Sequence, residues 1–160
     1  MLKKKILFVC LGNICRSPAA EEVMRSFVEK EGLSSLFYID SAGLTSFHRG
    51  EMPDRRMRDH ASKRGYSLTH LSRPLIIEDF YNFDMIFGMD KQNMKSLYKM
   101  APETSVENKI YRLTDFCVKY KADDIPDPYY GGPEGFDYVM DLLEDACNGL
   151  ISYLKNDLLS

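Results

Sequence analysis

A cysteine and an arginine separated by five residues give this sequence its strongest chemical signal. Cys10 follows the apolar run 6–9, which predicts a buried parallel strand, and Arg16 directly precedes a helix signal. Ser17 is expected to be the N-cap of that helix and Pro18 its first helical residue. The intervening segment is therefore predicted to be a loop at a helix N-terminus, where anions bind.

The composition of this loop suits a single tetrahedral oxyanion. Its backbone N–H groups can form an anion-binding nest, and Arg16 can present two parallel N–H donors. Gly12, which has no side chain, and Asn13, which tolerates left-handed geometry, allow the loop to curl tightly. The residues expected to surround the bound group are Leu11, Gly12, Asn13, Ile14 and Cys15.

Cys10 is the candidate nucleophile, because a nearby guanidinium and a helix N-terminus favour the reactive thiolate form of a cysteine. A phosphoryl group held in the loop would lie directly in front of its sulfur. The alternative is a buried core cysteine at the end of a strand, a common place for free cysteines. The spacing to Arg16, the preceding strand and the following helix start together favour the nucleophile.

Attack by a thiolate on a phosphate ester calls for an acid that protonates the departing oxygen, which contributes about a hundred- to ten-thousandfold in rate. Asp127 is the best candidate, because a proline on each side holds its backbone extended and stiff. Asp123 and Asp124 are nearby alternatives, and an aspartate in such a loop often only forms a turn. Tyr129 and Tyr130 could wall a slot for an aromatic ring.

The elements that must position these residues alternate between strand and helix. Strands are expected at 6–9, 37–40, 85–87 and 109–113, with a turn at Ser41-Ala42-Gly43 and a long loop at 121–135. A first helix is expected from Ser17 to a stop at Gly32, and a second at 54–64. A third should begin after Asp90 as its cap and turn Met94, Leu97 and Ala101 inward. A fourth follows the apolar stripe from Phe136 to Leu158.

This alternation predicts an α/β fold. We expect residues 1–160 to form a single domain, with a four-stranded parallel sheet, helices on both faces and the phosphate-binding loop after the first strand. In such sheets ligands bind at the carboxyl ends of the strands, which is where the segment from Cys10 to Ser17 lies.

The composition of the chain limits its partners. Its 160 residues, 44% of them hydrophobic, suffice for one compact domain with a core. The formal net charge of −3 gives no long-range attraction to nucleic acid or to anionic lipid, and neither nucleic acid nor a membrane is expected as a partner. The lysines and arginines between 49 and 64 are interpreted as a solvated helix face rather than a docking surface for an acidic partner.

The first residues imitate a secretion signal, but Gly12 and Asn13 interrupt the apolar run and Arg16 follows. A buried first strand explains them better, and no stretch is long enough to span a membrane, so a cytoplasmic location is expected. Neither the four cysteines nor the three histidines have the spacing of a zinc site, and no metal site is expected.

The segment Cys10-Leu-Gly-Asn-Ile-Cys-Arg-Ser-Pro18, together with Asp127-Pro-Tyr-Tyr130 late in the chain, resembles the motifs of the low-molecular-weight protein tyrosine phosphatases. The resemblance extends over essentially the whole chain. It implies hydrolysis of phosphotyrosine and small aryl phosphates through a phosphocysteine intermediate, without a metal or organic cofactor. The implied partners are phosphotyrosine-containing proteins or peptides, and we expect a monomer or a weak homodimer.

The resemblance also implies roles for individual residues. Cys10 would be the nucleophile, Arg16 the phosphate clamp, and Asp127 the acid of the first step and the base of the second. Ser17 would hydrogen-bond the sulfur of Cys10 and help it to leave.

Further implied roles concern the support and the walls of the loop. Asn13, Ser41 and His70 match a network that holds the loop in shape, and Cys15 matches a cysteine that can pair with the oxidised nucleophile. Phe47 stands on the expected pocket wall where relatives commonly carry Trp or Tyr, and Tyr129 is expected on the wall as well. Leu44 is a further departure, because relatives usually carry Thr there. These two departures, Phe47 and Leu44, leave open which peptides the protein prefers.

Two other functions remain as alternatives. An arsenate reductase of the same fold would need further cysteines in the mid-chain segment 68–90, which contains none. A catalytically silent phosphotyrosine-binding module would be expected to lack part of the machinery, whereas Cys10, Arg16 and Asp127 are all present.

Overall fold

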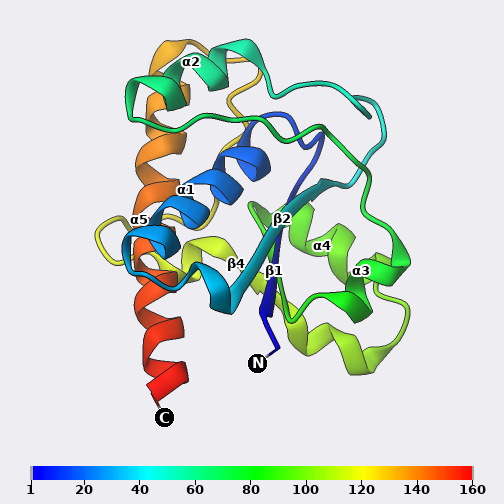
Figure 1. Ribbon diagram of the computed structural model, residues 1–160. Coiled ribbons are helices and arrows are strands. Elements are labelled where there is room, and N and C mark those ends of the chain that lie inside the picture. The colour runs from blue at the N-terminus through cyan, green and yellow to red at the C-terminus, as the bar shows by residue number, and fades with distance from the viewer. Residues whose placement is uncertain (1, 160) are drawn as a thin grey trace.

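A computed structural model of the protein describes residues 2–159, and its sheet lies between two layers of helices (Figure 1). The strands are β1 (Lys4–Cys10), β2 (Phe37–Gly43), β3 (Met85–Gly88) and β4 (Ile110–Arg112). The helices are α1 (Arg16–Lys30), α2 (Arg55–Lys63), α3 (Ile77–Asn82), α4 (Lys91–Met100) and α5 (Pro133–Leu159), with short 3₁₀ turns at Ser34–Leu36, Thr104–Lys109 and Leu113–Phe116.

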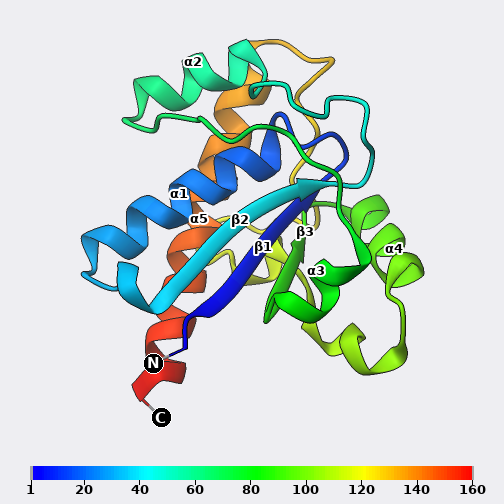
Figure 2. The same cartoon turned by 45° about the vertical axis from the view of Figure 1, so that its right-hand side comes forward.

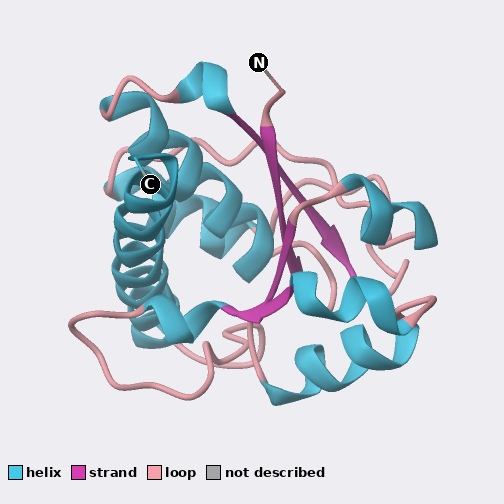
Figure 3. Ribbon diagram, turned by 90° about the horizontal axis from the view of Figure 1, so that it is seen from below, coloured by secondary structure: helices cyan, strands magenta, loops and turns pink. Residues whose placement is uncertain are grey.

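The four strands are parallel, in the order β2-β1-β3-β4. Successive residues of β1 enter two separate cores: Ile6 and Phe8 pack with α1, α2 and α5, whereas Leu7 and Val9 pack with α3 and α4. Figures 2 and 3 show these two groups of helices on opposite faces of the sheet. Burial on both faces explains why β1 is a continuous apolar run, and the α/β fold expected from the sequence is confirmed.

The order of the strands places a crevice beyond the end of β1. The chain leaves β1 through α1 to pair β2 on one side of it, and later enters β3 on the other side. The register pairs Cys10 with Gly43 and Val9 with Gly88, so the three strands end at one edge. Such a switch in winding direction is where ligands bind in open parallel sheets.

Two of the expected helix starts are confirmed by their caps. The Asp54 carboxylate accepts the backbone N–H groups of Arg56 and Met57, and the Asp90 carboxylate accepts that of Asn93. These bonds satisfy N–H groups that have no partner inside the helix. None of the helices within residues 2–159 combines the length and apolarity needed to cross a membrane.

The expected cap of α1 is wrong. The N-cap position is Cys15, which makes no side-chain capping bond, and Ser17 already lies inside the helix. The hydroxyl of Ser17 instead faces Cys10 and Asn13. The helix begins earlier because its first N–H groups open onto the loop of residues 10–16, called the phosphate loop below, where an anion can cap them.

The turn expected at Ser41-Ala42-Gly43 is also wrong, because β2 continues through these residues. Gly43 is needed for close approach rather than for a turn: a Cβ there would lie 3.0 Å from Cβ of Asn13 and 3.1 Å from the carbonyl carbon of Gly12. The end of β2 therefore runs directly beneath the phosphate loop.

Other differences are smaller. Helix α3 was not expected, β4 is shorter than the predicted strand, and α5 starts at Pro133, inside the predicted loop 121–135. Most of the predicted stripe of α5 is buried, but Leu158 is 44% exposed near the end of the helix, beyond the core.

Candidate active site

A cavity of about 530 Å³ opens at the carboxyl end of β1. It is lined by the phosphate loop, by the segment after β2 and by the loop of residues 126–132, called the Asp127 loop below. Its lining residues are Cys10, Leu11, Gly12, Ile14, Cys15, Arg16, Thr45, Phe47, His48, Glu51, Asp127, Tyr129 and Tyr130. The cavity therefore brings Asp127, which lies late in the chain, to Cys10 and Arg16 of the phosphate loop, the other two residues expected to carry the chemistry.

The sulfur of Cys10 receives two hydrogen-bond donors from Ser17. Its Sγ lies 3.0 Å from Ser17 Oγ and accepts the Ser17 backbone N–H at 3.4 Å. The Asn13 amide nitrogen donates to the same hydroxyl oxygen at 2.7 Å, so the Ser17 O–H can donate to the sulfur or, over a longer 3.5 Å, to the Ala42 carbonyl.

Arg16 is ordered before any ligand arrives. Its side chain is 2% exposed, and one terminal nitrogen donates to Asp90 Oδ2 at 2.6 Å and to the Ile125 carbonyl at 2.9 Å. Burial alone would lower the pKa of Arg16, but the facing Cys10, Asp90 and Asp127 raise it above its ordinary value, so the guanidinium stays charged. Within residues 2–159, its Nε is the one buried side-chain polar atom without a hydrogen-bond partner. An oxyanion in the cavity would supply that partner.

Asp127 faces the cavity, whereas its two alternatives do not. Its Oδ2 lies 3.6 Å from a terminal nitrogen of Arg16, and its Oδ1 accepts the backbone N–H of Tyr129 at 3.1 Å. Asp124 instead accepts the N–H of Lys91 at the start of α4, and neither Asp123 nor Asp124 lines the cavity. Geometry thus favours Asp127 among the three aspartates.

Asn13 holds the phosphate loop in its curled form. It is fully buried and has a positive φ of 58°, the left-handed geometry that the sequence suggested. Its amide nitrogen donates to the hydroxyls of Ser17 and Ser41, and its oxygen accepts from His70 Nε2 and from the backbone N–H of Arg73. All four hydrogen-bonding positions of this amide are therefore occupied.

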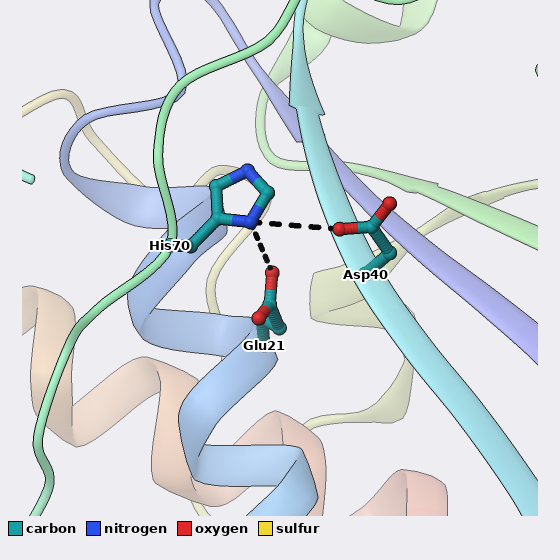
Figure 4. Close-up of side chains that lie close together, drawn as sticks. All are labelled: Glu21, Asp40 and His70. Atoms are coloured by element: carbon teal, nitrogen blue, oxygen red, sulfur yellow. Dashed lines mark ion pairs between the residues drawn. The ribbon is translucent and has the colours of Figure 1, made fainter. Parts of the chain in front are cut away.

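His70, whose Nε2 is hydrogen-bonded to this amide oxygen, also faces two carboxylates, those of Glu21 and Asp40 (Figure 4). His70 Nδ1 lies 3.2 Å from Glu21 Oε1 and 3.5 Å from Asp40 Oδ1, and Ser41 donates to the same Glu21 oxygen. The expected support roles of Ser41 and His70 agree with these contacts.

Glu21, Asp40 and His70 have the types and spacing of metal ligands. Arg25, however, already pairs with Glu21, and Arg73 pairs with Asp40. Both carboxylates of the cluster are thus already paired with arginines of the protein, and we assign the cluster to support of the phosphate loop.

The aromatic wall includes the three expected residues and one that was not expected. Phe47 and Tyr130 line the cavity at its rim, where they are 85% and 93% exposed, and Tyr129 lines it as well. The His48 ring lies 6.2 Å from that of Tyr129, and a Cβ on Gly12 would lie 3.0 Å from His48 Cδ2. The His48 ring therefore leaves little room for a side chain at position 12.

Several residues of the site were missed from the sequence. Asp90, expected only as a helix cap, also binds Arg16, and its position directly after β3, at the same sheet edge as Cys10, could have indicated this. His48 and Glu51, whose side chains pair at 3.0 Å, line the cavity together with Thr45. Their signal in the sequence was their closeness to Phe47, and Phe47-His48 also matches a landmark of the family resemblance.

Cys15 is the second thiol of the cavity. Burial, followed by the charges of Asp54 and Cys10, raises its pKa far above the ordinary value, so it is a neutral thiol. All four cysteines are free, and Cys147 is fully buried away from the cavity.

Comparisons with known proteins identify the family of the chain. The sequence profile of the family described as low molecular weight phosphotyrosine protein phosphatase matches residues 5–159. A low molecular weight phosphotyrosine protein phosphatase of Schizosaccharomyces pombe is 42% identical over 150 residues, which cover 92% of this chain and 96% of that protein.

Solved structures match as well. A protein tyrosine phosphatase of Entamoeba histolytica, crystallised with Hepes in its active site, superposes with a TM-score of 0.94 at 48% identity, covering 97% of this chain and 99% of that one. The Drosophila arginine phosphatase superposes with a TM-score of 0.88 at 36% identity, covering 94% and 98% of the two chains.

Proposed function

The chain belongs to the low molecular weight phosphotyrosine protein phosphatase family and is a hydrolase that acts on phosphotyrosine; from this premise we propose how its residues carry the reaction. The Cys10 thiolate attacks phosphorus, forming the S–P bond as the P–O bond to the tyrosine breaks. Arg16 and the backbone N–H groups of the phosphate loop bind the three phosphoryl oxygens. Asp127 gives its proton to the departing phenol oxygen.

The second step uses the same residues in reverse. The Asp127 carboxylate takes a proton from a water molecule whose oxygen attacks phosphorus, and the S–P bond breaks. The sulfur leaves as a thiolate, stabilised by the O–H and N–H groups of Ser17. Inorganic phosphate is released and the protonated Asp127 is restored.

One observation carries this proposal. The sulfur of Cys10, held by two donors from Ser17, and the guanidinium of Arg16, with its buried Nε unpartnered, line one cavity together with a carboxyl group. A phosphoryl group would satisfy the free donor and place phosphorus beside the sulfur.

Turnover of p-nitrophenyl phosphate tests the nucleophile. Cys10→Ser is expected to abolish turnover and to retain binding of inorganic phosphate, because the phosphate loop and Arg16 remain. Cys117→Ser is a matched control, since this thiol lies outside the cavity, and should retain turnover. A Cys10→Ser protein that still turned over substrate would refute the covalent role.

Two further measurements, thioredoxin consumption in the presence of arsenate and binding of phosphotyrosine, distinguish the remaining alternatives. A protein that consumed thioredoxin in the presence of arsenate, and released no phosphate from an aryl phosphate, would be an arsenate reductase. A reductase of this fold would need further cysteines to which a disulfide could pass. Cys10 and Cys15 are the two thiols that line the cavity, and no other cysteine that the structure describes lines it, which favours the hydrolase. A protein that bound phosphotyrosine without turnover would be a binding module.

Preference for phosphotyrosine is supported by the aromatic wall of Phe47, His48 and Tyr129. Initial rates on peptides carrying phosphotyrosine, phosphoserine or phosphoarginine would test it, and we expect phosphotyrosine to be the best substrate. The phosphoarginine peptide belongs in the panel because a relative of the same fold is named an arginine phosphatase. Equal rates on all three peptides would remove the aromatic preference.

We also propose that residues 1–160 form one domain that acts in the cytoplasm, without a metal or organic cofactor, as a monomer or weak homodimer. The match of the family profile to residues 5–159 supports the single domain. The four free thiols support a reducing compartment.

A further inference from the structure

The Asp127 loop is bound to the N-terminus of α2 by one side chain. A terminal nitrogen of Arg56 donates to the Tyr129 carbonyl at 2.8 Å, and the guanidinium lies over the rings of Tyr129 and Phe136, at 5.4 and 4.9 Å from their centroids. The backbone N–H of Tyr129 in turn donates to Asp127 Oδ1. Both polar groups of the Tyr129 backbone are thus engaged, one by Arg56 and the other by the carboxylate of Asp127.

The phosphate loop is bound to the same helix terminus. The backbone N–H of Asp54 donates to the Ile14 carbonyl at 2.7 Å. The Asp54 carboxylate accepts two bonds from the Arg56 guanidinium, at 3.2 and 3.0 Å. Burial opposes the charge on Asp54, but the hydrogen bonds from Arg56 hold its pKa below the ordinary value, which keeps the pair ionised at neutral pH.

We propose that Arg56 is a positioning residue, which sets the place of the Asp127 carboxyl relative to the phosphate loop; this rests on the proposed function of Asp127 as the acid. The path runs from the Ile14 carbonyl through Asp54 and Arg56 to the peptide group of Tyr129. The contacts between residues along it are hydrogen bonds, and its two ends belong to two loops that line the cavity.

The need for such a tether follows from the surroundings of Asp127. Its side chain is 36% exposed, and Arg16 attracts it from 3.6 Å away. Without Arg56, the carboxyl could close onto Arg16 or turn out to solvent, and in neither place would it meet the departing oxygen. Proton transfer requires the acid within hydrogen-bond reach of that oxygen.

The first test compares leaving groups. In Arg56→Ala we expect kcat/KM for phenyl phosphate, which reports the step that needs the acid, to fall about ten- to a hundredfold, a part of the usual contribution of a general acid. The kcat/KM for 2,4-dinitrophenyl phosphate, whose phenolate leaves without a proton, should change little. Arg55→Ala is the matched control, because Arg55 is the exposed neighbour on the same helix and carries the same charge. Arg55→Ala should leave both rates unchanged.

The second test is a double-mutant cycle. If Arg56 acts through Asp127, its replacement should have little further effect on phenyl phosphate turnover once Asp127→Asn is present. Arg56→Lys should recover part of the rate, since an ammonium group can still donate to the Tyr129 carbonyl. Inhibition by inorganic phosphate should be unchanged in Arg56→Ala, which reports an intact phosphate loop.

Two results would overturn the proposal: an equal loss of kcat/KM on both leaving groups, or the same loss of kcat/KM for phenyl phosphate in the presence and absence of Asp127→Asn. Failure of the proposed function would look different, because Asp127→Asn itself would then spare phenyl phosphate or Cys10→Ser would remain active.

Discussion

The side chain of Asn13 joins the phosphate loop to three other segments of the chain. It reaches Ser17 in α1, Ser41 in β2 and the segment around His70 and Arg73, while its own backbone is left-handed. An L-residue in that conformation is strained by about 1–2 kcal/mol, so the hydrogen bonds must outweigh the strain. One residue therefore fixes both the curl of the loop and its distance from the sheet.

Replacing Asn13 should separate the contribution of its hydrogen bonds from the cost of its left-handed backbone. Asn13→Ala leaves buried donors unpaired and retains the strain, and we expect a loss of about 2–4 kcal/mol in the free energy of unfolding. Asn13→Gly loses the same bonds without the strain and should be more stable than the alanine variant by about 1 kcal/mol. Urea unfolding of both proteins measures this, and an alanine variant at least as stable as the glycine variant would contradict it.

Single residues were predictable where their chemistry leaves a local signature. Cys10 and Arg16 lie within one short loop, and Asp127 lies between two prolines, so residue type and spacing marked them as candidates, with Asp123 and Asp124 left as alternatives to Asp127. Asp90 and Arg56 were not identified, because what makes them important is a contact with a segment far along the chain. Such contacts depend on how the elements fold against one another, which spacing alone does not reveal.

At the scale of elements, the start of a helix was predictable only where a side chain caps it. Asp54 and Asp90 marked α2 and α4 correctly, whereas Ser17 was misjudged because α1 leaves its first N–H groups for a ligand. Gly43 was misread as part of a turn, although it extends β2 beneath the loop. Both errors concern the phosphate loop, where binding rather than local stability selects the residues.

The long helix α5 provides a test of close packing between elements. Gly149 lies against the carbonyl oxygen of Phe116, and an added Cβ would lie 1.8 Å from that oxygen. We expect Gly149→Ala to lower the free energy of unfolding by about 1–3 kcal/mol, despite the better helix propensity of alanine.

Gly135→Ala is the control on the same helix, because the nearest neighbour of its added Cβ would be Pro128, at 4.0 Å. It should be neutral or stabilise by up to about 1 kcal/mol. Thermal unfolding of both variants checks the comparison, and equal effects of the two substitutions would contradict the packing argument.

At the scale of the whole molecule, the ionisable groups favour stability near neutral pH. Burial alone would raise the pKa values of Asp54 and Asp145, but hydrogen bonds from Arg56 and from backbone N–H groups hold them below the ordinary range. Burial raises the pKa of the thiols of Cys15 and Cys147. Stability should therefore decline below about pH 4, where the carboxylates take up protons, and above about pH 8.5, where the unfolded thiols lose theirs.

Asp145 allows the acid side of this dependence to be measured. Its carboxylate accepts the backbone N–H groups of Val118, Lys119 and Tyr120, which binds an exposed loop to α5. A lowered folded-state pKa contributes stability above the unfolded value that disappears as the pH falls. The stability difference between the natural protein and Asp145→Asn should thus be large at pH 7 and shrink below about pH 4.

The exposed Asp59 provides the control, since Asp59→Asn makes the same change of charge at a site without such donors. Its effect on stability should depend little on pH. Parallel pH profiles for the two variants would contradict the role of the backbone donors at Asp145.

The unsatisfied Nε of Arg16 has a thermodynamic consequence for the stability of the protein. Because its partner is supplied from outside, the native state gains stability from whichever tetrahedral anion occupies the loop. At a hundred times its dissociation constant, such a ligand adds about 2.7 kcal/mol by mass action. A melting curve followed against added orthophosphate would therefore report occupancy of the loop without any catalysis, and would respond equally in a protein whose acid had been removed.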